Sequence, residues 1–441
     1  MNSANRYPDR TGEISDLQRN SPDPINTQPL QKKYILICKK HGGVNIRRLK
    51  MQKNSGKSVL LLFILLIVST LSAGCTDNSS TSQTIQTSEE TSTRTLTDAL
   101  GRTVEIPESV DYVICSGVGS LRYLTYLEAQ DKIIGVERSE TTNSASNAKP
   151  YSLANPQFST DYPVFGETRG MDDPEKILSL DPLPEVIIKT YSATGFDPVE
   201  LQEKTGIPVV IVNTGDLADN KEDLYESLRI IGEVVGKEER AEEVISFFDE
   251  NIADLKERIA DIPEEDKPTC YVGGIGRAGG PQGFQSTEPT YPPFLFTNAI
   301  NVAYGDMDIN VADVSKEKII EWDPEIIFLD LNTIECGEDR SGLRLLQNDE
   351  SYRQLQAVQS GNVYGVLPFN QYATNFGSVL ADSYFAGKTL YPDKFEDVDL
   401  ENKTIEIYTF LVCKGDEELG REIYNTMINV YGTPAFAKLD I

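Results

Sequence analysis

Short apolar runs alternate with amphipathic segments along most of the chain beyond residue 94. Each run has the length of a buried strand, and turn residues or apolar residues spaced three or four apart follow it. The runs that we expect to be strands are 112–115, 132–136, 185–189, 208–212, 269–272, 326–329 and 362–366. Such alternation is typical of a parallel sheet covered by helices, so the pattern predicts an α/β fold.

Two long helical patterns interrupt this alternation. The first covers residues 221–235 and the second covers 237–260. In the second, the apolar residues share one stripe: Ala241, Val244, Ile245, Phe248, Ile252, Leu255 and Ile259. Its length of roughly 36 Å, at about 1.5 Å per residue, is enough to cross from one domain to another. We therefore expect two Rossmann-like α/β lobes joined by a single long helix, with a ligand cleft between them.

Two short segments, one in each expected lobe, match each other at a separation of 142 residues. Each begins with an N-cap residue, Asp173 or Ser315, and has a glutamate two positions later, Glu175 or Glu317. An exposed carboxylate in the first turn complements the helix dipole, which is the simplest interpretation of either glutamate. Its repetition in both lobes indicates a two-point contact with a partner that spans them.

The N-terminal region has the pattern of an export signal. Residues 59–68 are ten consecutive apolar residues preceded by Lys53 and Lys57, whereas a spanning helix needs about 20. Small residues then precede Cys75, as in a lipoprotein signal whose cysteine becomes the lipidated first residue. An uncleaved anchor is the alternative. Either interpretation places the body outside the cytoplasm, on the outer face of the plasma membrane or in the periplasm.

These patterns divide the chain into six parts. Residues 1–50 are a polar extension that is either a start-site artefact, with Met51 as the true start, or a cytoplasmic tail. The stretch 76–93 has 11 Ser or Thr in 18 residues, as in a flexible tether. The expected parts are the extension 1–50, the signal 51–75, the tether 76–94, the N-terminal lobe 95–236, the connecting helix 237–262 and the C-terminal lobe 263–441.

The charge is uneven and excludes one class of partner. The 441 residues include 41 Lys or Arg and 69 Asp or Glu, for a net charge of −28. Residues 1–75 have a net charge of +8, so the remainder has −36. A body this acidic repels phosphate backbones, so we expect no nucleic-acid partner and interpret the charge as a solubility surface.

The scarcity of histidine excludes several kinds of site. The single histidine, His41, lies in the N-terminal extension, so imidazole-dependent triads and most zinc sites are excluded from the body. The six cysteines are scattered without a CxxC pair, which argues against zinc or iron–sulfur sites. We expect no catalytic residue, no cofactor and no metal-ligand set in the body, and no enzymatic activity.

The body resembles a known family. It is similar to the substrate-binding proteins of ABC importers for iron complexes, haem and corrinoids, the class whose two lobes are joined by one rigid helix. The matching segments are 97–107, 132–136, 173–178, 314–327 and 357–364. The resemblance implies a lipid-anchored, monomeric receptor that binds a chelated metal, such as a ferric siderophore, and passes it to a two-subunit permease with its ATPase. In that family one glutamate per lobe docks arginines of the permease, and those positions match Glu175 and Glu317.

The resemblance also places the ligand in the cleft, among loops that follow strands. Arginine can pair with carboxylates of a chelate, and tyrosine or phenylalanine can stack on a planar ligand. For any single residue, packing or a turn is an equally good explanation. The candidates in the N-terminal lobe are Ser116, Gly119, Arg122, Tyr151, Arg169 and Tyr191. Those in the C-terminal lobe are Arg277, Gln282, Phe284, Gln285, Tyr291, Tyr372 and Asn375.

Two other functions fit the pattern less well. A surface sensor or adhesion protein would need the same export signal but no transporter. A two-lobed α/β enzyme that inserts metal into tetrapyrroles would need the histidine that the body lacks, and would not need export.

Overall fold

The computed structural model describes most of the body. The described residues are 92–141, 148–190, 195–277, 280–305 and 312–441, and they belong to one compact unit, 85–441. The expected extension, the signal with Cys75, the tether up to residue 91, and Tyr191 lie outside the described residues, whereas residues 93 and 94 already belong to the first strand.

The N-terminal sheet is parallel and buried on both faces. Its strands are ordered β3 (Val113–Ser116), β6 (Val186–Thr190) and β7 (Val209–Val212). A short parallel pair, β4 (Val136–Glu137) and β5 (Val164–Gly166), adjoins β3 through a bridge at Ile133. Successive side chains of β3 enter two separate cores, with Cys115 in the main core and Ile114 in a second one. A parallel sheet covered by helices on both faces requires such apolar strands.

Short helices and a hairpin complete this lobe. The hairpin pairs β1 (Thr93–Thr97) with β2 (Thr103–Pro107), and Gly101 takes a positive φ in its turn. The second core lies beneath the helices α3 and α4. The helices of the lobe are α1 (Ser120–Tyr126), α2 (Pro150–Leu153), α3 (Pro174–Leu178) and α4 (Pro198–Thr205).

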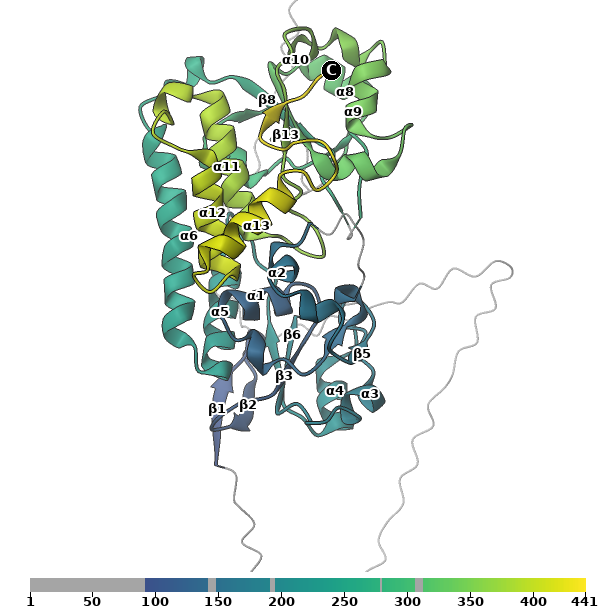
Figure 1. Ribbon diagram of the computed structural model, residues 1–441, viewed down its shortest axis with the longest axis vertical. Helices are drawn as coiled ribbons and strands as arrows, with labels where there is room; N and C mark the ends of the chain where they lie inside the picture. Colours follow the sequence, from purple (N-terminus) through teal and green to yellow (C-terminus); the bar gives the residue numbers. More distant parts are fainter. Residues whose placement is uncertain (1–91, 142–147, 191–194, 278–279, 306–311) are drawn as a thin grey trace, which may run out of the picture. The chain divides into compact units, whose positions relative to one another are not determined.

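The connection to the second lobe is a pair of helices, α5 (Lys221–Val235) and α6 (Glu238–Arg258). The expected apolar stripe of α6 is buried along its whole length. Near the start of α6, Arg240 donates a 3.2 Å hydrogen bond to the carbonyl oxygen of Tyr126, in the N-terminal lobe. At the other end, Arg258 donates to the carbonyl oxygen of Lys394 at 3.1 Å. The helix therefore reaches from one lobe to the other (Figure 1).

The C-terminal sheet repeats the parallel pattern. Its order is β10 (Ile300–Asn301), β8 (Thr269–Gly273), β12 (Ile326–Asp330), β13 (Val363–Val366) and β14 (Ala437–Lys438), of which only β14 is antiparallel. A separate antiparallel pair joins β9 (Ser286–Thr287) to β11 (Ala312–Asp313). The helices of this part are α7 (Pro292–Phe296), α8 (Lys316–Trp322), α9 (Gly342–Asn348), α10 (Gln356–Gln359) and α11 (Phe376–Leu390). The two lobes therefore share the expected α/β organisation.

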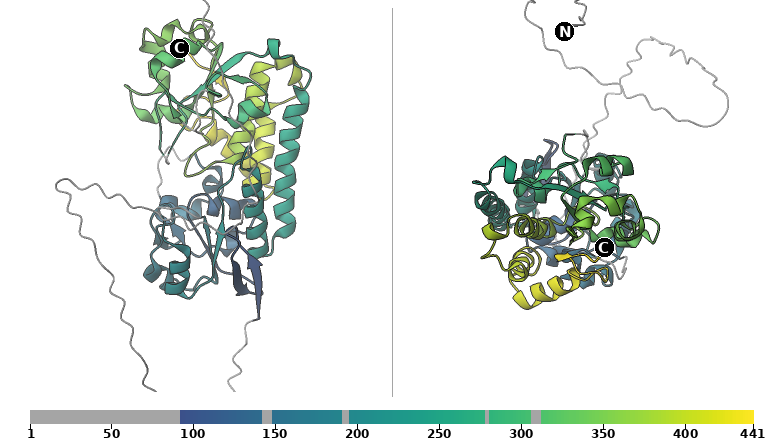
Figure 2. Two further views of the ribbon diagram at one scale, coloured as in Figure 1. Left: turned by 180° about the vertical axis from the view of Figure 1, so that it is seen from behind. Right: turned by 90° about the horizontal axis from the view of Figure 1, so that it is seen from above.

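The last two helices, α12 (Leu400–Val412) and α13 (Glu417–Met427), do not stay within the C-terminal lobe. Both contact α2 of the N-terminal lobe, and α12 also contacts α1. Arg240 of α6 donates to the carbonyl oxygen of Phe410 in α12, and its guanidinium lies 4.1 Å from that ring's centroid. Both views in which the lobes are seen from the side show α11 and α12 beside α6 (Figures 1 and 2). Helices from the end of the chain therefore strengthen the connection that α6 makes.

Several boundaries differ from the expectation. The run 132–136 was expected to be one strand, but residues 130–132 form a 3-10 turn, Ile133 makes an isolated parallel bridge to Val113, and β4 begins only at Val136. Helix α12 begins at Leu400, because the Asp399 carboxylate accepts the amide of Asn402 as an N-cap. Cys115, Cys270 and Cys413 are free thiols and are buried, so they pack as small apolar side chains.

Candidate functional site

The two lobes meet where the loop 370–375 crosses to the N-terminal lobe. Arg122 of α1 donates to the carbonyl oxygens of Gln371 at 2.9 Å and Tyr372 at 3.3 Å. In return, the side chain of Asn375 donates to the carbonyl oxygen of Ala148 at 3.1 Å. The loop follows β13 and α1 follows β3, so the carboxyl ends of both sheets face this contact. This is the edge at which α/β folds bind ligands.

Tyr372 is the centre of the contact. Its hydroxyl donates to the carboxylate of Glu137 and accepts the amide of Arg169 at 2.6 Å. Tyr372 and Arg169 have φ values of 49° and 63°, a conformation that non-glycine residues rarely adopt. Glu137 also accepts the amides of Gly117 and Gly170 at 2.9 and 2.7 Å. Burial nevertheless raises the pKa of Glu137 to about 7, because these donors only partly offset the loss of water.

A second polar group lies beside it, around Tyr151. The guanidinium of Arg122 lies 4.6 Å from the centroid of the Tyr151 ring, and both side chains are buried. The Tyr151 hydroxyl donates to Glu140 at 2.9 Å, and Lys149 pairs with Glu140 at 3.2 Å. The groups line a crevice that is too tight to hold a water molecule. Its lining is Cys115, Gly117, Gly119, Leu121, Arg122, Glu137, Glu140 and Tyr151.

Ser116 belongs to a buried ion pair. Lys189, which is 1% exposed, lies 2.6 Å from the carboxylate of Asp172, and the Ser116 hydroxyl donates to the same carboxylate at 2.7 Å. Lys189 in turn donates to the Ser116 oxygen at 3.1 Å. Because the hydroxyl proton is already engaged, Ser116 positions the pair and offers a ligand no free donor.

Gly119 permits the close approach of the lobes. It has a φ of 89° at the N-cap of α1, and a Cβ added there would lie 3.4 Å from the Cβ of Ala373. Any side chain at this position would therefore be strained and would press against the crossing loop.

Two aromatic candidates of the C-terminal lobe lie in the core. Phe284 is fully buried and packs edge-to-face against Tyr271 and Tyr352, with centroids 5.3 and 5.0 Å away. Tyr291 is 1% exposed and packs against Phe294 at 4.9 Å. The burial of both rings indicates that they stabilise the lobe rather than stack on a planar ligand. The segment 282–291, to which both residues belong, is therefore partly a packing segment.

The polar candidates of that segment are engaged or exposed. Arg277 forms an ion pair with Asp313. Gln282 donates weakly, at 3.4 Å, to the carbonyl oxygen of Arg277. Gln285 is exposed, and its carbonyl oxygen accepts the amide of Val314. The structure thus brings seven candidates together at the lobe contact: Ser116, Gly119, Arg122, Tyr151, Arg169, Tyr372 and Asn375.

Sequence reasoning missed the acidic members of the site. Glu137 directly follows the expected strand 132–136, which is the position where such folds place functional groups. Lys189 was visible as a charge inside an apolar strand. Glu140 had no such signal, because only the fold brings it to Tyr151.

The two glutamates of the internal match lie as their sequence pattern predicts. Glu175 and Glu317 are exposed and occupy the second positions of α3 and α8. Asp173 caps the first helix by accepting the amides of Glu175 and Lys176, and Ser315 caps the second by accepting that of Lys318. The predicted N-caps are confirmed, and each glutamate carboxylate belongs to the first turn of a short helix.

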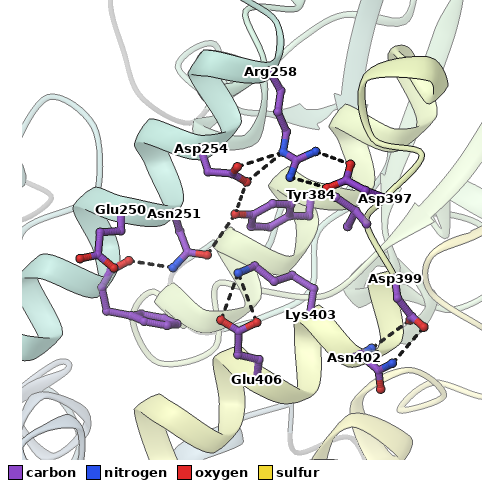
Figure 3. Close-up of a pocket in the computed structure, with 12 residues that line it drawn as sticks. Glu250, Asn251, Asp254, Arg258, Tyr384, Asp397, Asp399, Asn402, Lys403 and Glu406 are labelled. Carbon is purple, nitrogen blue, oxygen red and sulfur yellow. Dashed lines mark hydrogen bonds and ion pairs between the residues drawn. The ribbon is translucent and has the colours of Figure 1, made fainter.

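A separate hollow lies between α6, α11 and α12 (Figure 3). It is acidic, but most of its charged groups hold the helices together. Arg258 pairs with Asp254 at 3.0 Å and with Asp397 at 2.6 Å, and the Tyr384 hydroxyl donates to Asp254 at 2.8 Å. Lys403 pairs with Glu406 at 3.1 Å. These contacts form a seam between helices, away from the carboxyl ends of the sheets.

Two features, a metal-binding cluster and a membrane-spanning helix, are absent from the described residues. No group of three or more His, Cys, Asp or Glu side chains in these ranges is arranged to hold a metal ion. Within the same ranges, no helix combines the length and the apolar character needed to cross a membrane.

Two α/β lobes, a long connecting helix and a polar contact at the carboxyl ends of both sheets define a class of solute-binding protein. A family model described as periplasmic binding protein matches residues 113–368, and the chain belongs to this family. Its relatives here are the extracytoplasmic solute-binding components of ABC transporters rather than enzymes.

The matches to individual relatives have low sequence identity but cover most of each relative's length. The molybdate-binding protein MolA of Haemophilus influenzae is 23% identical over 340 residues, which is 71% of this chain and 90% of that protein. The petrobactin-binding protein YclQ of Bacillus subtilis is 23% identical over 312 residues, 70% of this chain and 90% of that protein. A periplasmic solute-binding protein of Veillonella parvula has the same fold, with a TM-score of 0.58, 20% identity and coverage of 76% of this chain and 99% of that one.

Proposed function

We propose that the protein is the receptor of an ABC importer that captures a chelated metal between its lobes and delivers it to the permease. The observation that carries the proposal is the convergence of both sheets' carboxyl ends on the contact between Arg122 and the loop 370–375. A ferric siderophore, haem or corrinoid is the cargo class that we favour.

Delivery requires a surface that the permease can recognise. We propose that Glu175 and Glu317 dock arginines of the permease, one per lobe. Both are exposed at equivalent positions of capped helices, and arginine–carboxylate pairs can be bidentate, so two of them would fix the orientation of the complex.

The docking role is tested by the double variant Glu175→Ala with Glu317→Ala. Import of the chelate into cells should fall by roughly tenfold or more, because each lost pair removes a charge-assisted contact. Affinity of the purified protein for the chelate should stay unchanged, because both side chains lie outside the lobe contact. The matched control is Glu203→Ala with Glu321→Ala, which removes one exposed glutamate from each lobe. Normal import by the first variant would end the docking assignment.

The location of the protein follows from its N-terminus. We propose that 51–75 is a signal, that Cys75 is lipidated and that the tether 76–94 leads to the lobes at 95–236 and 263–441, joined by 237–262. Relatives described as substrate-binding lipoproteins support this arrangement. Fractionation of cells that express wild-type protein or Cys75→Ala tests it. The wild type should remain with the membrane and incorporate a radioactive lipid precursor, whereas the variant should incorporate none. A wild-type protein that incorporates no label would refute lipidation.

A further inference from the structure

The exposed apolar side chains of the body concentrate in one segment of the N-terminal lobe. Seven large apolar side chains are well exposed in the described ranges, and four of them lie within residues 171–199: Met171, Leu178, Leu183 and Val199. This segment contains α3 and α4, which contact each other (Figure 1). Scattered exposed apolar residues need no explanation, but a group of them on one surface marks a place where another molecule binds.

This surface adjoins the carboxylate that we propose to dock the permease. Leu178 lies three residues after Glu175, and side chains at that spacing are neighbours on a helix. Val199 occupies the same place in α4 that Glu175 occupies in α3, since each is the second residue after a capping aspartate. An arginine that reached Glu175 would therefore approach over an apolar surface.

A groove of about 420 Å³ opens between the start of α3 and the residues that lead into α4. Its apolar lining comes from Met171, Pro174, Gly195 and Phe196. The amide of Phe196 donates to the carbonyl oxygen of Gly170 at 2.7 Å, and the ammonium of the buried Lys189 donates to the same oxygen at 2.9 Å. The wall of the groove is thus anchored to the buried ion pair of the lobe, so a side chain that enters needs to order little.

The acidic groups at the rim of the groove are paired within the lobe. Glu167 lies 2.7 Å from Arg138, and Asp173 lies 3.5 Å from Lys176. Glu175 takes part in no ion pair among the described residues. The groove therefore offers apolar surface, and the carboxylate beside it is the group available to a cation of the partner.

The matching segment of the C-terminal lobe has different surroundings. The separation of 142 residues places Asp313 at the position of Met171, and Ile320 at the position of Leu178. Met171 and Leu178 are 55% and 45% exposed, whereas Asp313 is charged and Ile320 is partly buried against the core. The two matched glutamates therefore differ, because only the N-terminal one has exposed apolar residues at both of these positions.

We infer that the permease binds the two lobes through chemically different contacts. At the C-terminal lobe an arginine pairs with Glu317 through charge alone. At the N-terminal lobe an arginine pairs with Glu175, and a large apolar side chain next to it in the permease enters the groove of Met171 and Phe196. The inference rests on the proposed function and deepens it by specifying the partner's chemistry at each lobe.

Charge favours the permease over two other occupants of this surface. The net charge of −36 beyond residue 75 repels an anionic membrane. In a symmetric pair of copies, the acidic rim of one groove would lie against that of the other, which costs binding energy. A permease loop that carries an arginine meets neither obstacle. Burial of Met171 and Leu178 would then supply affinity, and the two arginine pairs would set the orientation.

Photo-crosslinking in cells of the native host identifies the occupant. The full chain carries Leu178→p-benzoylphenylalanine, and the control carries Leu100→p-benzoylphenylalanine, since Leu100 is comparably exposed in the turn between β1 and β2. Mass spectrometry should identify the adduct at Leu178 as the membrane-spanning subunit of an ABC importer, and the control should not form it. An adduct with phospholipid or with a second copy, the same adduct in the control, or no adduct would overturn the inference.

Affinity for that importer, held in nanodiscs of phosphatidylcholine, separates the two contacts. Met171→Gln with Leu178→Gln should weaken binding roughly tenfold at both low and high salt, because apolar burial is not screened. Glu317→Ala should weaken it at about 150 mM salt but have little effect at about 500 mM, where exposed charge pairs are screened. Leu100→Gln is the matched control and should bind as the wild type does. Melting temperatures report that each variant is folded.

Wild-type affinity of Met171→Gln with Leu178→Gln would overturn the inference, and so would an equal loss in Leu100→Gln. A loss in Glu317→Ala that is the same at both salt concentrations would overturn the contact by charge alone. The proposed function is judged by Glu175→Ala with Glu317→Ala. If that variant loses binding while the apolar variant keeps it, the docking assignment stands and the apolar contact is refuted. If it binds as the wild type does, the docking assignment itself fails.

Discussion

Tyr372 connects the two lobes through a single hydroxyl group. It satisfies Glu137 and the amide of Arg169 together, and both of these groups are otherwise removed from water. A residue in a left-handed conformation costs free energy, and here the hydrogen bonds across the lobes hold it in place. The contact is therefore a junction whose loss affects both lobes.

Tyr372→Phe tests this junction. Removing the hydroxyl takes one of three donors from the buried Glu137 carboxylate and removes the acceptor of the Arg169 amide, so the free energy of unfolding should fall by about 1–3 kcal/mol. Chemical denaturation measures the loss. Tyr304→Phe is the control, because Tyr304 is 63% exposed and should change stability by less than about 0.5 kcal/mol. Equal stability of Tyr372→Phe and wild type would contradict the role of the junction.

The buried acids make stability depend on pH in a definite direction. Burial raises the pKa of Glu137 to about 7 and that of Glu288 and Asp330 to about 8, from ordinary values near 4. The folded protein therefore holds protons that the unfolded chain has released. Their contribution is present in full below about pH 4 and is lost as the pH rises toward 8.

We expect the free energy of unfolding to decrease between pH 5 and pH 8, as measured by urea denaturation. The double variant Glu288→Gln with Asp330→Asn should flatten the profile, because two of the three groups no longer titrate. A wild-type stability that increases over this range would show that these carboxyl groups are not buried as described.

At the scale of elements, periodicity predicted most of the fold. The stripe of α6 and the caps of α3 and α8 are local features, so the sequence contained the information needed to place them. The prediction of one strand over 132–136 was wrong, because a 3-10 turn followed by a two-residue strand has the same apolar composition as a longer strand. The attachment of α12 and α13 to the N-terminal lobe was not predictable, since it depends on contacts between residues far apart in sequence.

The site was predictable only where it follows strands. Arg122 lies in α1, which follows β3, and Tyr372 lies in the loop that follows β13, and the structure brings the two residues together. Phe284 and Tyr291 share the same segment type but face the core, and one sequence does not reveal which face of a loop is buried. Glu140 could not be predicted from the sequence, because only the fold brings it to Tyr151.

Phe248 shows how the connecting helix holds the lobes. Its ring lies 6.3 Å from that of Tyr126 in α1 and 5.9 Å from that of Phe376 in α11, and it is fully buried. Phe248→Ala should therefore lower the free energy of unfolding by about 3–5 kcal/mol. Its neighbour Phe247 is only partly buried, where its ring stacks on that of Phe410 in α12, so Phe247→Ala should cost less, about 1–2 kcal/mol. Equal losses in a denaturation experiment would contradict the burial of one face of α6.

At the scale of the whole body, α6, α11, α12 and α13 make a helical connection rather than a free hinge. Side chains of α6 bond to both lobes, and α12 contacts the N-terminal lobe from the other end of the chain. Two lobes held in this way suit a receptor that encloses its cargo by small movements. Under the proposed function, the cargo would contact the loops at the carboxyl ends of both sheets, and the exposed Glu175 and Glu317 would remain accessible to the permease.

Hydrogen–deuterium exchange of the purified protein tests the central claim most directly, with and without the metal chelate that most raises its melting temperature. The account predicts that the ligand slows exchange at 116–122, 137–140 and 370–375, the segments that meet between the lobes. Exchange in the hollow between α6 and α12 should not change. Protection confined to that hollow, or no chelate that stabilises the protein, would contradict a cargo site between the lobes.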